Sequence, residues 1–107
     1  MYALYASSKP TRLLLYNSVY YASGTRPSTA VPLTGLPAGT ASVRVLRLTA
    51  PAATSRADQG APPTIGGAGT FTAECASSGT RTLEVVSVSG GSASVKVGAS
   101  EAVIVYL

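Results

Sequence analysis

The chain has 107 residues, which is enough for one domain with a single core and too few for a catalytic barrel. Hydrophobic residues make up 46% of it and charged residues 11%, a composition that excludes an intrinsically disordered chain. The formal net charge of +4 comes from bases that are dispersed along the sequence, so no basic cluster indicates a nucleic-acid partner.

Short runs rich in Val, Leu, Thr and Tyr alternate with Gly, Pro and Ser turn signals. The predicted strands, in chain order, are residues 2–6, 12–20, 29–33, 41–49, 69–76, 81–87, 93–97 and 101–106. No stretch keeps a helical period of apolar residues free of Gly or Pro. The sequence therefore predicts a single all-β domain over residues 1–107, an antiparallel β-sandwich of about eight strands with Greek-key-like crossovers and one core.

The N-terminal segment, YALYASS from residue 2, has neither the basic region nor the apolar run of a signal peptide. No stretch approaches the ~20 apolar residues of a membrane helix, so we expect no membrane partner. Residues 8–10, 78–80 and 89–91 carry the short polar or glycine-containing sequences of hairpin turns.

Tyr20 and Tyr21 end the second predicted strand, and they are the candidate glycan contacts of the chain. The alternative is structural: Tyr16 and Phe71 fill the core, while the Tyr20–Tyr21 pair sends its hydroxyls to solvent or backbone. The chain contains no Trp, the residue on which sugar-binding platforms rely most, so we favour the structural alternative.

The sequence VRVLRL, residues 43–48, changes the phase of its alternation between Val45 and Leu46. A β-bulge at this point would re-aim the strand. Alternatively, the strand keeps its register, and Leu46 and Leu48 pack on a companion domain with Arg44 at the rim of the contact. Both interpretations stay open, and the second makes Arg44, Leu46 and Leu48 candidate domain-interface residues.

Residues 50–68 contain three prolines and three glycines and are expected to form a partly ordered crossover between the two sheets, with a functional loop as the alternative. Cys75 is the single cysteine, and its strand context predicts a buried, inert thiol. The chain has no histidine, the usual partner of a nucleophile and the commonest metal ligand, so we expect no catalytic residue, no metal and no cofactor.

A hydrolase that retains configuration would need two carboxylates about 5 Å apart in a cleft, one of them with a raised pKa. The carboxylates of the chain are Asp58, Glu74, Glu84 and Glu101. Glu74 and Glu84 are expected in flanking strands, facing solvent or paired with a cross-strand partner such as Arg81. Residues 102–106 show no alternation of apolar and polar side chains, which predicts a strand shielded from water on both faces. Such a strand lies either beside an interface or under its neighbours.

Five collinear segments resemble the C-terminal β-sandwich domain of family 79 glycoside hydrolases, the β-glucuronidase and heparanase group. They are YALY at residues 2–5, RLLLYN at 12–17, GTRPS at 24–28, residues 43–55 with their RLTAP core, and SEAVIV at 100–105. Together they span nearly the whole chain. The sequence departs from this resemblance at IGGAGTF, residues 65–71, where such domains have an aromatic residue followed by Ala-Gly-Gln.

The resemblance implies a non-catalytic accessory domain that supports the catalytic (β/α)₈ barrel of an extracellular, β-glucuronidase-like enzyme. It also implies that the chain is a fragment without that barrel, and that the sandwich lacks a strand that it borrows from the far N-terminus, which leaves an unpaired sheet edge. The alternative is a free-standing module that binds glucuronic-acid-containing glycans through Tyr20, Tyr21 and the loop of residues 50–68.

Overall fold

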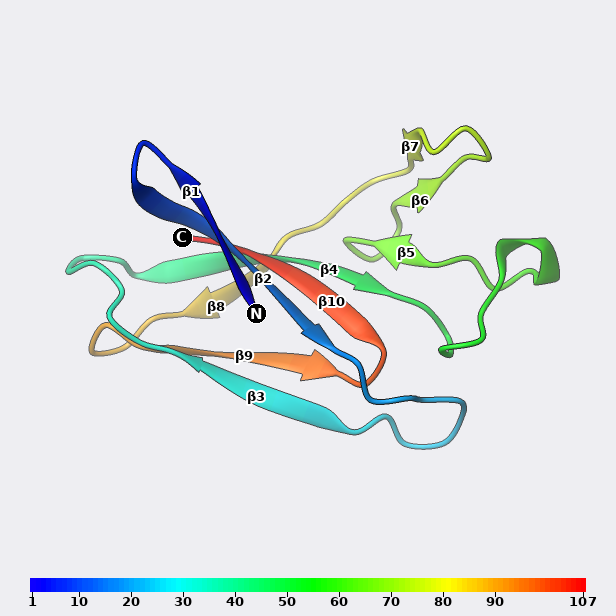
Figure 1. The fold of residues 1–107 in the computed structure, drawn as a ribbon, viewed down its shortest axis with the longest axis horizontal. Coiled ribbons are helices and arrows are strands. Elements are labelled where there is room, and N and C mark those ends of the chain that lie inside the picture. The colour runs from blue at the N-terminus through cyan, green and yellow to red at the C-terminus, as the bar shows by residue number, and fades with distance from the viewer.

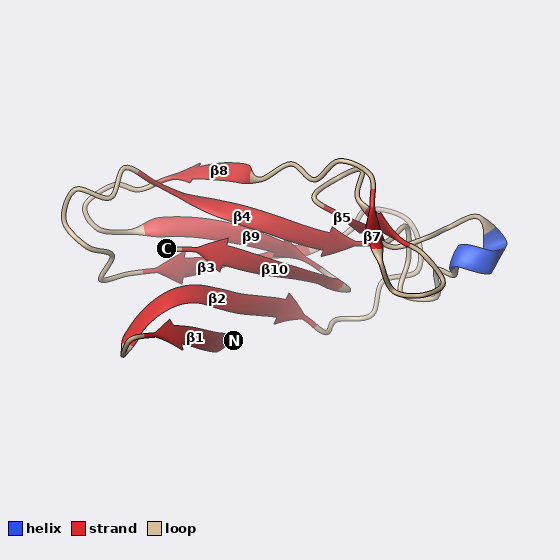
Figure 2. Ribbon diagram, turned by 90° about the horizontal axis from the view of Figure 1, so that it is seen from above, coloured by secondary structure: helices blue, strands red, loops and turns tan.

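The computed structural model describes all 107 residues and has an all-β architecture. A six-stranded antiparallel sheet, ordered β1-β2-β10-β4-β5 with β8 also paired to β4, lies over the two-stranded sheet β3-β9 (Figures 1 and 2). The strands are β1 (Tyr2–Ala6), β2 (Lys9–Asn17), β3 (Ser28–Leu33), β4 (Ser42–Thr49), β5 (Thr64–Ile65), β6 (Thr70–Phe71), β7 (Ser77–Ser78), β8 (Glu84–Ser87), β9 (Ala93–Gly98) and β10 (Glu101–Tyr106). The predicted antiparallel β-sandwich is confirmed.

The core lies between the two sheets and consists of every second residue of the strands that face it, as strand geometry requires. Its buried members are Leu15, Val43, Val45, Val103 and Val105 from the large sheet, and Leu33, Ala93, Val95 and Val97 from the small sheet. Branched aliphatic side chains of this kind suit a pleated, buried surface, which explains why these segments form the central strands.

Strand β4 passes through the phase change at Val45 without a bulge. Its pairing with β10 runs unbroken from Leu48↔Ala102 to Arg44↔Tyr106. The register therefore sends Val45 to the core and Leu48 to the opposite, outer face of the large sheet. The strand keeps its register and the predicted bulge is wrong, while the companion domain stays a prediction.

Strand β10 lies between β2 and β4, which explains its run of apolar residues. Val103 and Val105 are buried in the core, whereas Ala102, Ile104 and Tyr106 are half-buried on the outer face. Both faces of this strand thus need apolar side chains, one for the sandwich core and one for whatever the outer face contacts.

The segment of residues 50–83 leaves the sheet at the end of β4 and returns to the same edge, because β5 and β8 both pair with β4. The prediction that residues 50–68 cross between the sheets is therefore wrong. The excursion contains a single-turn 3₁₀ helix (Ala57–Gln59) and the β6–β7 hairpin, which project from the sandwich (Figures 1 and 2).

The predicted strand 69–76 and the predicted turn 78–80 are also wrong. Only Thr70–Phe71 is a strand there, and the chain turns over residues 72–76, where the Thr72 N–H donates to the Ala76 carbonyl at 2.8 Å. The turn places Cys75 at a positive φ of 62°. Ser77–Ser78 then pairs back on β6 instead of turning.

The structure also places several side chains differently from the prediction. Cys75 is exposed in the turn, not buried, and Glu74 lies in the same turn. Phe71 and Tyr16 are 45% and 53% exposed and do not fill the core. Tyr16 lies opposite Ala102 in the register, which places it on the outer face of the large sheet.

Two of the predicted hairpin turns are present. The β1–β2 turn passes through Ser7 and Ser8, both at positive φ, and lies earlier than predicted because Lys9 and Pro10 already belong to β2. Ser89 and Ser92 exchange two backbone hydrogen bonds of 2.8 and 3.0 Å around Gly90 and Gly91, although β8 before the turn and β9 after it belong to different sheets. No helix of the structure has the length and apolar character needed to cross a membrane.

Candidate docking face and the polar cluster at Glu101

The outer face of the large sheet carries two complete rows of apolar side chains, because residues that pair across strands lie on the same face. One row runs across four strands through Tyr2, Leu14, Ile104 and Leu46. The next row runs through Tyr16, Ala102, Leu48 and Ile65. The term outer face is used below for these rows together with the row of Arg12 and Arg44 beside them.

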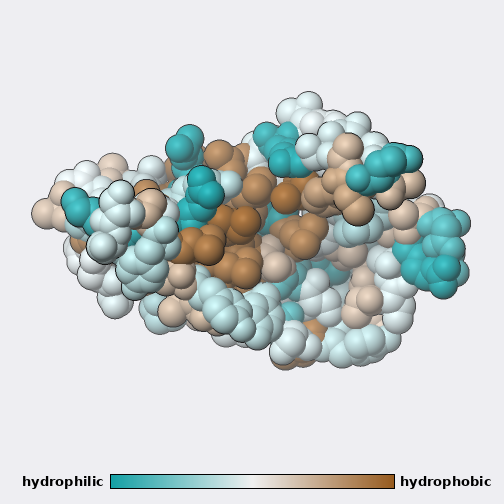
Figure 3. All heavy atoms as spheres, turned by 45° about the horizontal axis from the view of Figure 1, so that its top comes forward, coloured by the Kyte–Doolittle hydropathy of each residue, from teal (hydrophilic) through white to brown (hydrophobic).

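Much of this surface is open to solvent. Tyr2 is 61% exposed and Leu48 is 40% exposed, while Ile104 between them is half-buried. The rings of Tyr2 and Tyr16 stack with centroids 6.4 Å apart, so the aromatic surface is continuous with the aliphatic one. Figure 3, in which the top of Figure 1 comes forward, shows hydrophobic side chains gathered in the middle of this side of the molecule. A contiguous apolar face of this kind is typical of an interaction site.

The structure places the predicted interface residues together. Arg44, Leu46 and Leu48 are alternate residues of β4 and all point to the outer face. Leu46 is already 92% covered by its neighbours, being 8% exposed, whereas Leu48 lies open beside it. Sequence reasoning missed the partners of these residues on β1 and β2, since nothing in a single sequence gives the strand order.

A second apolar surface lies at the other side of the large sheet, between the β1–β2 hairpin and the free edge of β3. This groove has a volume of about 750 Å³. The hairpin contributes Ala3, Tyr5 and Leu13, and the region of β3 contributes Val31–Leu33, among others. The groove exists because the small sheet has two strands and covers only part of the six-stranded sheet.

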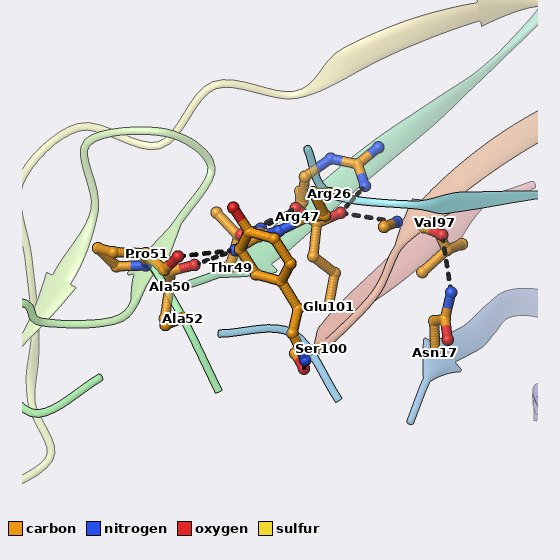
Figure 4. Close-up of polar contacts among 12 residues, drawn as sticks. Asn17, Arg26, Arg47, Thr49, Ala50, Pro51, Ala52, Val97, Ser100 and Glu101 are labelled. Atoms are coloured by element: carbon orange, nitrogen blue, oxygen red, sulfur yellow. Dashed lines mark hydrogen bonds and ion pairs between the residues drawn. The ribbon is translucent and has the colours of Figure 1, made fainter. Parts of the chain in front are cut away.

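The main polar cluster of the sandwich is built around Glu101, at the start of β10 (Figure 4). Its Oε1 accepts hydrogen bonds from Arg26 Nη1 at 2.7 Å and from Thr49 Oγ1 at 2.8 Å. Its Oε2 accepts from Arg47 Nη1 at 2.8 Å and from the Gly98 N–H at 2.9 Å. A Cβ at position 98 would lie 2.7 Å from Oε2, so a larger residue there would push the carboxylate away from its present place.

The cluster ties the two sheets together where the core valines end. Three residues on core-facing positions of the large sheet bond to the backbone of β9: Asn17 Nδ2 donates to the Val97 carbonyl at 3.1 Å, Arg47 Nη2 donates to the Lys96 carbonyl at 3.0 Å, and Glu101 accepts from Gly98. In β2, β4 and β10 alike, the inward-facing residues change from hydrophobic to polar at the same end of the sandwich.

The charges of the cluster alternate in sign. Arg47 lies between Glu84, which it binds through Nε and Nη2 at 2.7 and 3.0 Å, and Glu101. The bond to Glu84 raises the pKa of Arg47. Burial raises the pKa of Glu101, but the hydrogen bonds to Thr49, the Gly98 N–H and the two arginines outweigh burial and hold that pKa below its ordinary value.

The chemistry of this arrangement is that of a structural ion-pair network. Glu84 and Glu101 approach opposite sides of one guanidinium, and the lowered pKa of Glu101 keeps it ionised, the reverse of what a general acid needs. The cross-strand partner of Glu84 is Arg47 and not Arg81, which lies over the ring of Phe71 instead. No three acidic or cysteine side chains of the chain gather as a set of metal ligands.

The two candidate glycan contacts have different surroundings. Tyr20 is 67% exposed on the loop after β2. Tyr21 is half-buried, its hydroxyl donates to the Gly24 carbonyl at 2.8 Å, and the Arg26 guanidinium lies 4.4 Å from its ring centroid. The Tyr21 ring thus packs on the arginine that holds Glu101.

Known proteins resemble this chain in sequence and in fold. The model of the glycosyl hydrolase family 79 C-terminal β domain matches residues 1–104. This chain belongs to that family. Among curated proteins, none matches the sequence.

A solved structure shares the fold of this family 79 C-terminal β domain: 4-O-α-L-rhamnosyl-β-D-glucuronidase from Fusarium oxysporum 12S, in its complex with Rha-GlcA. It is 49% identical to this chain, with a TM-score of 0.89 over 98% of the chain. The chain spans 22% of the length of that glucuronidase. A family 79 C-terminal β domain is one part of a larger glycoside hydrolase, whose catalytic part is a separate domain.

Proposed function

We propose that this domain is the non-catalytic C-terminal part of a β-glucuronidase-like hydrolase and supports its catalytic (β/α)₈ barrel by docking through the outer face. The observation that carries the proposal is the pair of apolar rows on that face, with Tyr2, Tyr16 and Leu48 open to solvent. Polar side chains would face water at these strand positions if nothing covered the sheet.

The size of the outer face suits a contact between domains of one chain. Three rows about 7 Å apart across four or five strands about 4.8 Å apart give roughly 400 Å² on this side. Contacts between domains bury about 600 to 1,500 Å² counted over both sides. Counted over both sides, the outer face gives about 800 Å², which lies within that range.

The groove beside β3 supports the proposal that the chain is a fragment whose small sheet is completed by a strand from elsewhere in the parent enzyme. The backbone of β3 pairs on one side only, with β9. The apolar side chains of Ala3, Tyr5 and Leu13 face the space next to that free edge. An added strand would pair with β3 and cover these side chains in one step.

The substrate class and the extracellular location belong to the same proposal. The substrate class is supported by the 49% identity to the Fusarium rhamnosyl-glucuronidase, an enzyme that acts on a glucuronide. The residues of this domain do not select that substrate in the proposal, because recognition and hydrolysis are assigned to the barrel.

Light scattering and binding of a hydrophobic dye by the isolated chain test the docking face. We expect concentration-dependent association and dye fluorescence, and we expect Leu48→Asp to reduce both. Ser94→Asp, a change at an exposed position on the opposite side of the sandwich, is the matched control and should leave both unchanged. A monomer at all concentrations with no dye signal would contradict the proposal.

A glycan contact at Tyr20 and Tyr21 stays a prediction of the alternative function. Titration of the isolated chain with polysaccharides that contain glucuronic acid tests it. Saturable binding that Tyr20→Ala abolishes would favour a carbohydrate-binding module over a supporting domain.

A further inference from the structure

The third row of the outer face differs from the two apolar rows. It crosses five strands through Leu4, Arg12, Tyr106, Arg44 and Val85, which pair in register from β1 to β8. Two arginines thus flank one tyrosine, and apolar residues close the row at both ends. Arg12 and Arg44 lie two strand spacings apart, about 10 Å between backbones.

Neither arginine has an acidic partner within the domain. The Arg12 guanidinium lies 5.2 Å from the centroid of the Tyr106 ring, and neither Arg12 nor Arg44 forms an ion pair or a side-chain hydrogen bond. The four carboxylates all lie elsewhere: Glu84 and Glu101 bind Arg47, Asp58 binds Arg56, and Glu74 lies in the projecting hairpin. The N–H donors of both outer-face arginines are therefore free for a partner.

Covering the outer face would take these two guanidinium groups out of water together with the apolar rows. A buried charge without a counter-charge destabilises an interface, whereas a carboxylate opposite each arginine removes that penalty and fixes the docking register. We propose that the surface of the catalytic body that covers this face is apolar opposite the two apolar rows and carries carboxylate side chains opposite Arg12 and Arg44. This inference rests on the proposed docking function.

A protein surface fits the whole face better than a free anionic ligand does. The arginine row is continuous with two apolar rows that no anion would use, since Tyr106 lies next to Ile104 along β10 on the same face. The Arg12 guanidinium also covers one face of the Tyr106 ring, the surface on which a sugar ring would stack.

The test uses a hybrid enzyme in which the full 107-residue chain replaces the matching domain of the Fusarium rhamnosyl-glucuronidase. Arg12→Glu and Arg44→Glu are compared with Lys96→Glu, which makes the same change of charge at an exposed position of β9 on the opposite side of the sandwich. Arg44→Gln is a milder variant for the case that a reversed charge prevents assembly. Unfolding temperatures are measured for each hybrid and for each isolated chain.

We expect Arg12→Glu and Arg44→Glu to lower the unfolding temperature of the hybrid by about 3 °C or more relative to Lys96→Glu, and Arg44→Gln to lower it by less. The difference should shrink when NaCl rises from about 0.05 M to about 1 M, because the pairs are ionic. In the isolated chain, Arg44→Glu and Lys96→Glu should be equally stable. Arg12→Glu loses its contact with the Tyr106 ring in both proteins, so only its additional loss in the hybrid measures docking.

Three other outcomes would overturn the inference in distinguishable ways. If Leu48→Asp destabilises the hybrid but the arginine variants match Lys96→Glu, the face docks without acidic partners. If Leu48→Asp is harmless as well, the docking function itself fails. Saturable binding of free glucuronate to the isolated chain that Arg44→Gln abolishes would identify an anion site in place of a docking contact.

Discussion

Glu101 joins segments that lie far apart in the sequence. Its carboxylate joins Arg26 from the loop before β3, Arg47 and Thr49 from β4, and the backbone of Gly98 at the end of β9. The donors Arg26 and Arg47 lie 75 and 54 residues away in the sequence. Loss of this carboxylate would therefore loosen the contact between the two sheets at one end of the sandwich.

We expect Glu101→Gln to lower the free energy of unfolding at neutral pH by about 2 to 3 kcal/mol, because it leaves Arg26 half-buried without its counter-charge. Since the folded pKa of Glu101 is lowered, its contribution is present above the ordinary pKa of about 4.5 and is lost as the pH falls toward the folded pKa. Urea unfolding at several pH values should show the two proteins converging in acid.

Asp58→Asn is the control for this prediction. Asp58 also has a lowered pKa from its bond to Arg56, but the pair is exposed at the 3₁₀ helix and is screened by solvent. It should change stability little at any pH. A Glu101→Gln protein that stays less stable than the parent by the same amount throughout the acid range would contradict the role given to the charge.

Individual residues also show what a single sequence can and cannot reveal. The alternation Val43-x-Val45-x-Arg47 already marks Arg47 as an inward residue if the strand keeps its register, so the inward arginine was accessible to prediction. Its acidic partners were not, because nothing local indicates that β10 and β8 lie on the two sides of β4. Arg26 was missed for the same reason.

Among the elements, most strands that bury side chains in the core were predicted well. Residues 101–106 have the predicted bounds, and β3, β4 and β9 differ by one residue at one end, because hydrophobic alternation fixes such strands. The bounds of β1 also match, although all its side chains are exposed, whereas β2 carries the buried Leu15 but spans Lys9–Asn17 and not the predicted residues 12–20. The β6–β7 hairpin was not predicted, since it packs on no core and its polar side chains carry no period. The path of residues 50–83 depends on which edge of β4 is free, which is a property of the whole sheet.

The free edge of β3 gives a prediction at the scale of one element. Hydrogen exchange of the isolated chain should be fast along β3, where the amides that point away from β9 have no acceptor and Pro32 provides no amide, and slow along β10. In the hybrid enzyme, an added strand would slow exchange in β3. Equal protection of β3 and β10 in the isolated chain would contradict an unpaired edge.

At the scale of the whole molecule, two unfilled surfaces lie on a domain that is otherwise well packed. The core is closed and its ion-pair cluster is satisfied, since no buried polar side-chain atom lacks a partner. The outer face and the groove beside β3 are apolar and open. A body larger than this chain accounts for both, which agrees with the 22% share of the Fusarium enzyme that the chain spans.

Hydroxyl-radical footprinting of the isolated chain and of the hybrid enzyme tests the docking claim most directly, because it measures the exposure of individual side chains. The account predicts that Tyr2, Tyr16 and Leu48 are labelled in the isolated chain and protected severalfold in the hybrid, whereas Tyr20 is labelled equally in both. Equal labelling of Tyr2, Tyr16 and Leu48 in the two proteins would show that the outer face stays in water and would contradict the account.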